Sequence, residues 1–595
     1  MRKTTMLTAA LALAGLAFGA QAQLPGAQQF EQCDELGSSG ISMDGSAVAA
    51  RKSVAAHIDE MLELQGWLIS EAPRTLAKSA GFSVELSRQD QYQLGLIDCA
   101  ECERLSEQER RMLVGLAREV GHVVDFSRAG AKQLRGDGEF ERGALGGMAD
   151  GGFVWTAKLA SPGASGLRLA LSGLDLPANA ALYVFNDRGE AFGPYLGTGV
   201  NGSGEVTTNM VSGDVAYLQL RVFGTPKSMQ GLSFRIDSIG HISSRFELAE
   251  ALDAAGGLLA KTHCTSGRVN AGCVENAMCS GTFSHISNLR NAIGAMLYAS
   301  GSGYYICTGG LIANTADDPL FLTANHCISK SSEANTLEVY WNHTVPCGTR
   351  TCQGAWEVQG RASEVGATIR AGSSTGDYTL MQLNSTLPTG GYKLGWNSTP
   401  VAGSSNAQLY RVSHPNGAPQ AYSEQRVNTS AGTCRTLPRG TYIYSTDNFG
   451  ATEGGSSGSP VVNGQNQIVG QLYGACGSNL NDVCDSGSNR TVDGAFAAYF
   501  SAVESILTGG GGDPGTGFTL TGSGSKVKGA WRASLSWSGS SGNVNVYRGG
   551  SAVASNIGGS SYVDQTSFKG SGSLTYKVCN TSDTSVCSNE VTISF

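Results

Sequence analysis

Three short segments of the sequence carry a histidine, an aspartate and a serine, in that order along the chain. His326 stands in Thr-Ala-Asn-His-Cys, Asp377 precedes an apolar, strand-like run, and Ser457 stands in Gly-Gly-Ser-Ser-Gly-Ser-Pro. A serine hydroxyl is a poor nucleophile near neutral pH, so it needs a neighbouring base, and that base needs an acceptor that fixes its tautomer. We therefore predict Ser457 as the nucleophile, His326 as the general base and Asp377 as the orienting acid of a hydrolase.

Two glycines, Gly454 and Gly455, come shortly before the predicted nucleophile. Glycine permits a backbone shape in which the amides of Gly455 and Ser457 both point at the oxyanion that develops during acyl transfer. Each such donor is typically worth about 3 kcal/mol. The segment therefore predicts an oxyanion hole formed by Gly455 and Ser457.

A pair of cysteines supports the choice of His326 as the base. A disulfide between Cys307 and Cys327 would tie two neighbouring strands together and fix the loop that presents His326. His414 is the other histidine considered for this role, but it has no neighbouring cysteine that could fix its loop through a disulfide. We expect His414 to be a structural histidine.

In this order, the three segments resemble the serine peptidases of the trypsin/chymotrypsin fold, in particular the bacterial lysyl endopeptidase branch. That branch shares Thr-Ala-x-His-Cys, an Asp before a hydrophobic strand, and Gly-Ser-Ser-Gly-Ser-Pro; Val-Tyr-Trp-Asn at 339–342 and Gly-Gln-Leu at 470–472 also fit it. The resemblance covers roughly residues 264–505. It implies a chymotrypsin-like double β-barrel that hydrolyses peptide bonds in protein or peptide substrates, with Ser457 rather than Ser456 or Ser459 as the nucleophile.

The same resemblance implies two further disulfides. Cys273 would pair with Cys484, and Cys279 with Cys347. The pairing of four other cysteines in this region stays open: Cys264, Cys352, Cys434 and Cys476.

Substrate preference depends on one position of the primary pocket. In lysyl endopeptidases, a carboxylate shortly after a cysteine binds the lysine ammonium, and counting from Cys484 places Asp493 in the matching position. A second register places Thr491 near the base of the pocket instead. Tyr473 matches an aromatic or histidine on the wall of the cleft, and Ala451 stands where trypsin-like enzymes keep their specificity carboxylate. The resemblance implies a preference for Lys or Arg on the acyl side.

The chain has 595 residues, which is too long for one compact domain. Residues 1–22 have two basic residues, an apolar run and Ala-Gln-Ala, which is the pattern of a secretory signal. Apolar residues spaced by threes and fours at 54–62 and 105–116 predict helices, and alternating short runs predict strands elsewhere. We predict a mainly β protein with these parts: signal peptide 1–22, propeptide 23–261 (helical part about 47–125, β-sandwich about 150–245), trypsin-like peptidase domain 262–508, Gly-rich linker 509–516, and a small C-terminal β-sandwich 517–595 with Cys579 bonded to Cys587.

The residue before the nucleophile bears on activation. In animal enzymes of this fold, an Asp at that position pairs with the ammonium of a new N-terminus, whereas this chain has Ser456. We therefore expect activation by removal of residues 23–261, which would act as an intramolecular chaperone and inhibitor. The bond between Lys261 and Thr262 is the expected self-processing point. The alternative is an N-terminal binding domain retained in the mature protein.

Composition limits the other classes of function. Charged residues make up 15% of the chain, its formal net charge is −8, and it has no cluster of Lys and Arg, so nucleic acid is not an expected partner. There is no His-Glu-x-x-His motif, and we expect neither a metal nor a cofactor. The cysteines suit an exported protein, so we expect a secreted, extracellular monomer without a membrane span. The alternative function is a non-catalytic secreted binding or adhesion protein on a peptidase scaffold.

Overall fold

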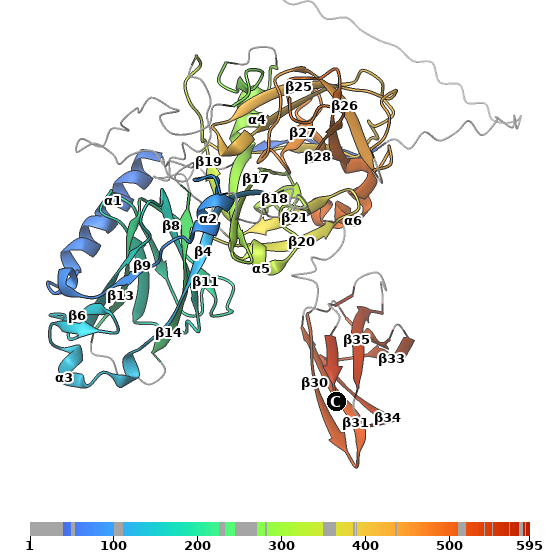
Figure 1. Ribbon diagram of the computed structural model, residues 1–595. Coiled ribbons are helices and arrows are strands. Elements are labelled where there is room, and N and C mark those ends of the chain that lie inside the picture. The colour runs from blue at the N-terminus through green and yellow to red at the C-terminus, as the bar shows by residue number, and fades with distance from the viewer. Residues whose placement is uncertain are drawn as a thin grey trace, which may run out of the picture. The chain divides into compact units, whose positions relative to one another are not determined.

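The structure is a computed structural model, and its fold is mainly β, as predicted (Figure 1). The residues it describes are 40–48, 54–99, 111–224, 232–243, 270–279, 283–348, 365–384, 387, 390–434, 437–509, 519–538, 540, 542–549, 551–570, 572–581, 587–588 and 591–595.

Six strands of the predicted peptidase region close into a β-barrel. They follow the order β28-β27-β24-β25-β26-β29, and an additional pairing between β28 and β29 completes the ring. Valine and isoleucine side chains, including Val461 and Ile443, fill one of its buried clusters. The strands are β24 (Gln408–Ser413), β25 (Ala421–Val427), β26 (Tyr442–Phe449), β27 (Pro460–Val462), β28 (Gln467–Gly477) and β29 (Asn489–Ala495); β15 (Glu275–Asn276) pairs with β25, and β23 (Gly395–Asn397) with β28.

A second set of strands precedes this barrel in the chain. In β21, Tyr378 and Leu380 face one buried cluster, while Met381 and Leu383 face another, so both sides of the strand are covered. The elements are α4 (Ile286–Ala292), β16 (Ile293–Ser300), β17 (Gly303–Leu311), β18 (Leu320–Ala324), α5 (Ser331–Ala334), β19 (Glu338–Trp341), β20 (Ala367–Ser373), β21 (Tyr378–Leu383) and β22 (Tyr392–Lys393). The region ends in α6 (Phe496–Thr508).

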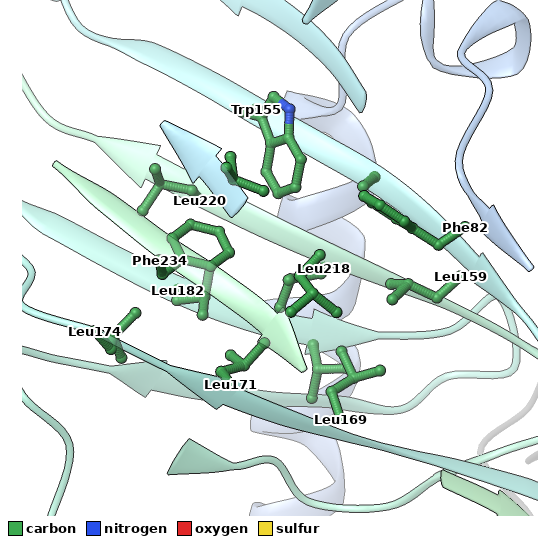
Figure 2. Close-up of a cluster of buried hydrophobic side chains, with 14 of the residues drawn as sticks. Phe82, Trp155, Leu159, Leu169, Leu171, Leu174, Leu182, Leu218, Leu220 and Phe234 are labelled. Carbon is green, nitrogen blue, oxygen red and sulfur yellow. The ribbon is translucent and has the colours of Figure 1, made fainter. Parts of the chain in front are cut away.

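Two sheets of the N-terminal region enclose a core of leucine and aromatic side chains, among them Trp155, Leu182 and Leu218 (Figure 2). Helix α1 covers the other face of β9, where Leu68 meets Tyr183. The elements are α1 (Val54–Glu71), β3 (Phe82–Ser83), α2 (Arg88–Gln93), β4 (Met112–Asp125), α3 (Ala131–Leu134), β5 (Gly138–Phe140), β6 (Gly143–Gly147), β7 (Phe153–Ala160), β8 (Gly166–Ser172), β9 (Ala180–Phe185), β10 (Ala191–Tyr195), β11 (Val206–Thr207), β12 (Val211–Ser212), β13 (Val215–Val222) and β14 (Ser233–Ile242).

The helix predicted to include Met112 and Leu116 is wrong, because these residues belong to the 14-residue strand β4. Short apolar runs in a strand that is covered on both faces also place apolar residues three and four apart, so spacing alone cannot separate the two structures. Residues 115–125 of β4 pair with β14 of the N-terminal region, and residues 112–116 pair with β17 of the predicted peptidase region, with Gly303 opposite Leu116. The two regions therefore share one 11-stranded sheet.

A buried ion pair also joins these regions. Arg168 of β8 lies 3.6 Å from Glu338 of β19, measured from Nε to Oε2, and both side chains are fully buried. Asn209 Nδ2 and the Met210 amide donate to the same carboxylate, at 2.7 and 3.1 Å. Arg168 donates in turn to the Thr336 carbonyl at 2.8 Å. Burial raises the pKa of Glu338, and the charge of Arg168 counters that effect.

Two short strands from the start of the described chain also pair with the predicted peptidase region. Strand β1 (Ser42–Met43) is antiparallel to β23, and β2 (Ser46–Ala47) is antiparallel to β22. Segments that precede residue 261 therefore contribute strands at three places: β17, β22 and β23.

The C-terminal residues form a three-stranded and a four-stranded sheet, and Cys579 is bonded to Cys587. Their strands are β30 (Thr519–Val527), β31 (Ala530–Ser538), β32 (Val544–Arg548), β33 (Ser551–Ile557), β34 (Ser561–Lys569), β35 (Ser573–Asn580) and β36 (Val591–Ser594). Among the described residues, none of the helices combines the length and the apolar character that crossing a bilayer requires. The predicted signal peptide 1–22, the Lys261-Thr262 bond, and the cysteines Cys264 and Cys352 lie outside the described residues.

The end of α6 gives a test of whether the C-terminal sheets are independent. A chain that ends at Gly509 keeps the whole helix and the glycine that caps it with a φ of +67°. We expect it to melt at the same temperature as the full chain in the transition of residues 270–509, and to turn over short peptides at the same rate.

A chain that ends at Tyr499 is the matched control. It loses the buried side chains Phe500, Val503 and Leu507, each of which contributes roughly 1.5–3 kcal/mol by burial. Calorimetry should show a clear fall in its melting temperature. Lost peptide turnover in a well-folded chain ending at Gly509 would show that the C-terminal sheets are needed for activity.

Candidate active site

Strand pairing places His326 beside Asp377. His326 follows β18 and Asp377 precedes β21, and these antiparallel strands pair Ala324 with Tyr378. The end of one strand therefore lies beside the start of the other. The Asn325 amide donates to the Asp377 carbonyl at 3.0 Å, which extends the pairing by one step.

Both carboxylate oxygens of Asp377 accept hydrogen bonds from His326. The backbone amide donates to Oδ1 at 2.8 Å, and ring atom Nδ1 lies 2.7 Å from Oδ2. Since a carboxylate only accepts, Nδ1 carries the proton and Nε2 keeps its lone pair. Nε2 is buried and has no hydrogen-bond partner among the described residues. His326 is thus held in the tautomer that a general base requires.

A glutamine holds the Asp377 turn. Asp377 has a φ of +52° and follows Gly376 at +77°, so both residues lie in the left-handed region. Gln471 Nε2 donates to the carbonyls of both residues, at 2.8 and 3.0 Å. Gln471 lies on β28, so the six-stranded barrel positions an acid that belongs to the other set of strands.

The loop of Ser457 is tied to the loop of His326. The Thr308 amide donates to the Ser457 carbonyl at 2.9 Å, and the Thr308 hydroxyl donates to the Gly455 carbonyl at 2.8 Å. The disulfide between Cys307 and Cys327 joins the neighbours of Thr308 and His326, and Sγ of Cys327 lies 3.7 Å from the Ser457 carbonyl oxygen. The disulfide therefore brings the predicted base and nucleophile into one site.

The backbone before Ser457 has the shape of an anion-binding turn. Gly455 has a φ of +91°, and a Cβ there would lie 3.0 Å from the His414 carbonyl, so only glycine fits without strain. Among the described residues, no acceptor is bound to the amides of Gly455 or Ser457. Both donors are therefore available to a substrate oxygen. No hydrogen bond joins Ser457 to His326 Nε2 in the described structure, and such contacts are often long before substrate binds.

The competing side chains are engaged elsewhere. Ser456 is fully buried, and its hydroxyl lies 3.0 Å from that of Ser413. Ser459 is also fully buried. Nδ1 of the buried His414 donates to the Ala418 carbonyl at 2.9 Å, and burial lowers the pKa of His414 to about 4. His414 is therefore neutral at physiological pH and supports the backbone beside Gly455.

Several supporting residues could not be identified from the sequence: Thr308, Gln471, Ser413, and the pair Asn270 and Glu453. Asn270 Nδ2 donates to Glu453 at 2.5 Å, which attaches the start of the predicted peptidase region to the loop that leads to Ser457. Of these residues, only Thr308 had a signal in the sequence that could have indicated a place near the site, namely its position directly after Cys307. The others act through partners more than 40 residues away, which a single sequence does not reveal.

The predicted specificity residues have different surroundings. The Tyr473 ring lies 6.0 Å from that of His326, so it stands on the wall of the site. Asp493 is fully buried and forms an ion pair with Arg411, while Gln425 donates to its second oxygen at 2.8 Å. Thr491 donates to the carboxylate of Asp447 at 2.8 Å. The charge of Asp493 is thus compensated inside the protein.

The disulfides implied by the resemblance are present in the structure. Cys273 is bonded to Cys484, and Cys279 to Cys347. Cys434 is bonded to Cys476, a pairing that the sequence left open. This last bond connects β28 to the loop before β26, next to Tyr473.

The region that contains this site is similar in sequence to known proteins. Residues 267–488 match the family described as lysyl endopeptidase, C-terminal domain. The chain is 33% identical over 224 residues to a lysyl endopeptidase of Pseudomonas aeruginosa, covering 35% of this chain and 46% of that protein. It is 29% identical over 218 residues to secreted RxLR effector protein 73 of Plasmopara viticola, covering 36% of this chain and 51% of that protein. The matches therefore span about half the length of these curated relatives.

Two solved structures are also similar. The inactive form of the Rv3671c protease is 15% identical, with a TM-score of 0.25, over 38% of this chain and 93% of that one. The scabies mite inactivated protease paralogue S-I1 is 12% identical, with a TM-score of 0.25, over 37% of this chain and 96% of that one. The sequence matches confirm that residues 267–488 resemble the lysyl endopeptidases, as predicted from the three segments.

Proposed function

We propose that this protein is a secreted serine endopeptidase that acts through His326, Asp377 and Ser457. The observation that carries the proposal is the pair of hydrogen bonds from His326 to Asp377, which leaves Nε2 unprotonated beside the loop of Ser457. The disulfides support an oxidising compartment outside the cell. A preference for Lys or Arg on the acyl side is part of the proposal.

Each step of the reaction has a group to perform it. Nε2 of His326 takes the proton from Ser457 Oγ as that oxygen bonds to the carbonyl carbon, and the amides of Gly455 and Ser457 stabilise the resulting oxyanion. His326 then gives the proton to the leaving nitrogen, and the C–N bond breaks. Water, activated by the same Nε2, hydrolyses the acyl-enzyme and restores Ser457. Asp377 stabilises the imidazolium in both halves.

We propose further that residues 23–261 act as an intramolecular chaperone and inhibitor of the peptidase. Strands β1, β2 and β4 pair with strands of the predicted peptidase region, and Arg168 compensates the buried Glu338. Met112, at the start of β4, lies against the loop of the nucleophile, since a Cβ on Gly454 would be 3.9 Å from its sulfur. These contacts support a role both in folding and in restricting access to the site.

Labelling with a phosphonofluoridate tests the nucleophile. We expect one adduct, on the tryptic peptide that contains Ser457, and no adduct in Ser457→Ala, with or without a chelator. Turnover of a peptide substrate should fall by at least about 10⁴-fold in Ser457→Ala and by a similar factor in His326→Ala, because the triad acts as a unit. The exposed Ser501→Ala is the matched control and should behave as the parent protein. A parent protein that takes no label would instead favour the binding or adhesion protein.

The buried ion pair tests the chaperone role. In a Ser457→Ala chain, which cannot process itself, Arg168→Met leaves Glu338 buried without its cation and should cost about 3–5 kcal/mol in urea unfolding. Adding Glu338→Gln removes the unpaired charge and should recover part of the loss. The control Arg128→Met removes a 71% exposed cation and should cost less than about 1 kcal/mol. Equal losses for the two arginines would contradict the proposed dependence of the peptidase on its N-terminal region.

A further inference from the structure

Three charged side chains interact within the six-stranded barrel, near the candidate active site. Arg411 of β24 and Asp493 of β29 form a fully buried ion pair. Asp447 of β26 is close enough to both for Arg411 to lower its pKa and Asp493 to raise it. The group contains one positive and two negative charges, so it carries a net charge of −1 when both acids are ionised. Asp447 is the one of the two acids without an ion-pair partner among the described residues.

Asp447 is partly exposed and has one side-chain hydrogen-bond donor among the described residues. Both of its oxygens accept from the single hydroxyl of Thr491, at 2.8 and 3.0 Å, and this is the one side-chain donor to Asp447 among the described residues. A carboxylate can accept about four hydrogen bonds, so capacity remains. Asp447 keeps partial exposure, yet desolvation raises its pKa to about 6. The Asp447 carboxylate can therefore accept further hydrogen bonds from a group that arrives from solution.

Strand register places Thr491, the hydrogen-bond donor to Asp447, near the wall of the candidate active site. Thr491 on β29 is opposite Ala475 on β28, and Ala475 is two residues from Tyr473, whose ring lies 6.0 Å from that of His326. Gly474 lies between them, and a Cβ on it would meet no atom within 4 Å, so the strand is open at this point. Asp447 is thus hydrogen-bonded to a residue of β29 whose partner on β28 is two residues from Tyr473.

The chemistry of the Asp447 carboxylate favours a cationic side chain. A substrate ammonium or guanidinium would neutralise the net charge of −1 and supply the donors that Asp447 can still accept, whereas a second carboxylate would be repelled. Asp493 cannot serve in the same way, because Arg411 and Gln425 already bind both of its oxygens.

We propose that Asp447, positioned by Thr491, receives the cationic side chain of the substrate residue on the acyl side of the cleaved bond. This inference rests on the proposed serine endopeptidase activity. Asp493 then keeps Arg411 from neutralising Asp447, and Thr491 is a positioning residue that orients the carboxylate.

Three peptides that differ only at the acyl-side residue test the inference: lysine, arginine, and norleucine, which has no charge. For the processed parent enzyme, we expect kcat/KM to be higher for lysine than for norleucine. In Asp447→Asn, the ratio of kcat/KM for lysine to kcat/KM for norleucine should fall by about 10- to 100-fold, because only the lysine peptide loses a charged partner. Glu504→Gln, which removes an exposed acid on α6, is the control. It should change neither the lysine to norleucine ratio nor the rate of phosphonofluoridate labelling at Ser457.

Two further variants distinguish the proposed roles of Thr491 and Asp493. Thr491→Val should lower the lysine to norleucine ratio severalfold, and it provides the same test if Asp447→Asn does not fold. Asp493→Asn should reduce thermal stability, because it leaves Arg411 buried without its anion. An unchanged lysine to norleucine ratio in Asp447→Asn, or no lysine preference in the parent, overturns the inference while the labelled Ser457 preserves the endopeptidase. Absence of both labelling and hydrolysis overturns the endopeptidase itself.

Discussion

The antiparallel pairing of β18 with β21 is the constraint on which the candidate site depends. It sets Ala324 opposite Tyr378, so that the next residues along the two strands bring His326 to Asp377. Every other support acts on this pair or aligns Ser457 with it. Gln471 holds the acid from the six-stranded barrel, and the disulfide of Cys327 holds the histidine loop against β17. The site is therefore built where the two sets of strands meet, with contributions from both.

Two buried ion pairs bring together opposite charges from distant parts of the chain. Arg168 meets Glu338 across the sheet that the N-terminal and predicted peptidase regions share, and Arg411 meets Asp493 within the barrel. Both pairs are fully buried, so each charge depends on its partner for compensation. Asp447 differs because its one side-chain donor among the described residues is a hydroxyl. The proposed substrate cation would supply the ion-pair partner that Asp447 lacks there.

The sequence predicts local features of this structure better than it predicts distant contacts. The segments of His326, Asp377 and Ser457 were recognisable because each combines a reactive side chain with neighbours of special geometry, such as Gly455. The mainly β fold followed from short alternating runs broken by glycine. The strand at 112–125 was mistaken for a helix, since only its pairing with β14 and β17 decides between the two. The ion pair of Asp493 was equally hidden, because Arg411 lies 82 residues away.

Strand β4 pairs with both β14 and β17, so the N-terminal and predicted peptidase regions assemble through it. Their presence on one chain affects how this assembly occurs. A separate N-terminal protein would have to find β17 by diffusion, at whatever concentration the cell supplied. Residues on one chain meet at an effective concentration that the connecting segment sets, typically millimolar for a short flexible connection. Each copy of β17 is made together with its own copy of β4, in a fixed ratio of one to one. The edge of β17 at 303–306, which could otherwise pair with a neighbouring molecule, is therefore covered from within during folding.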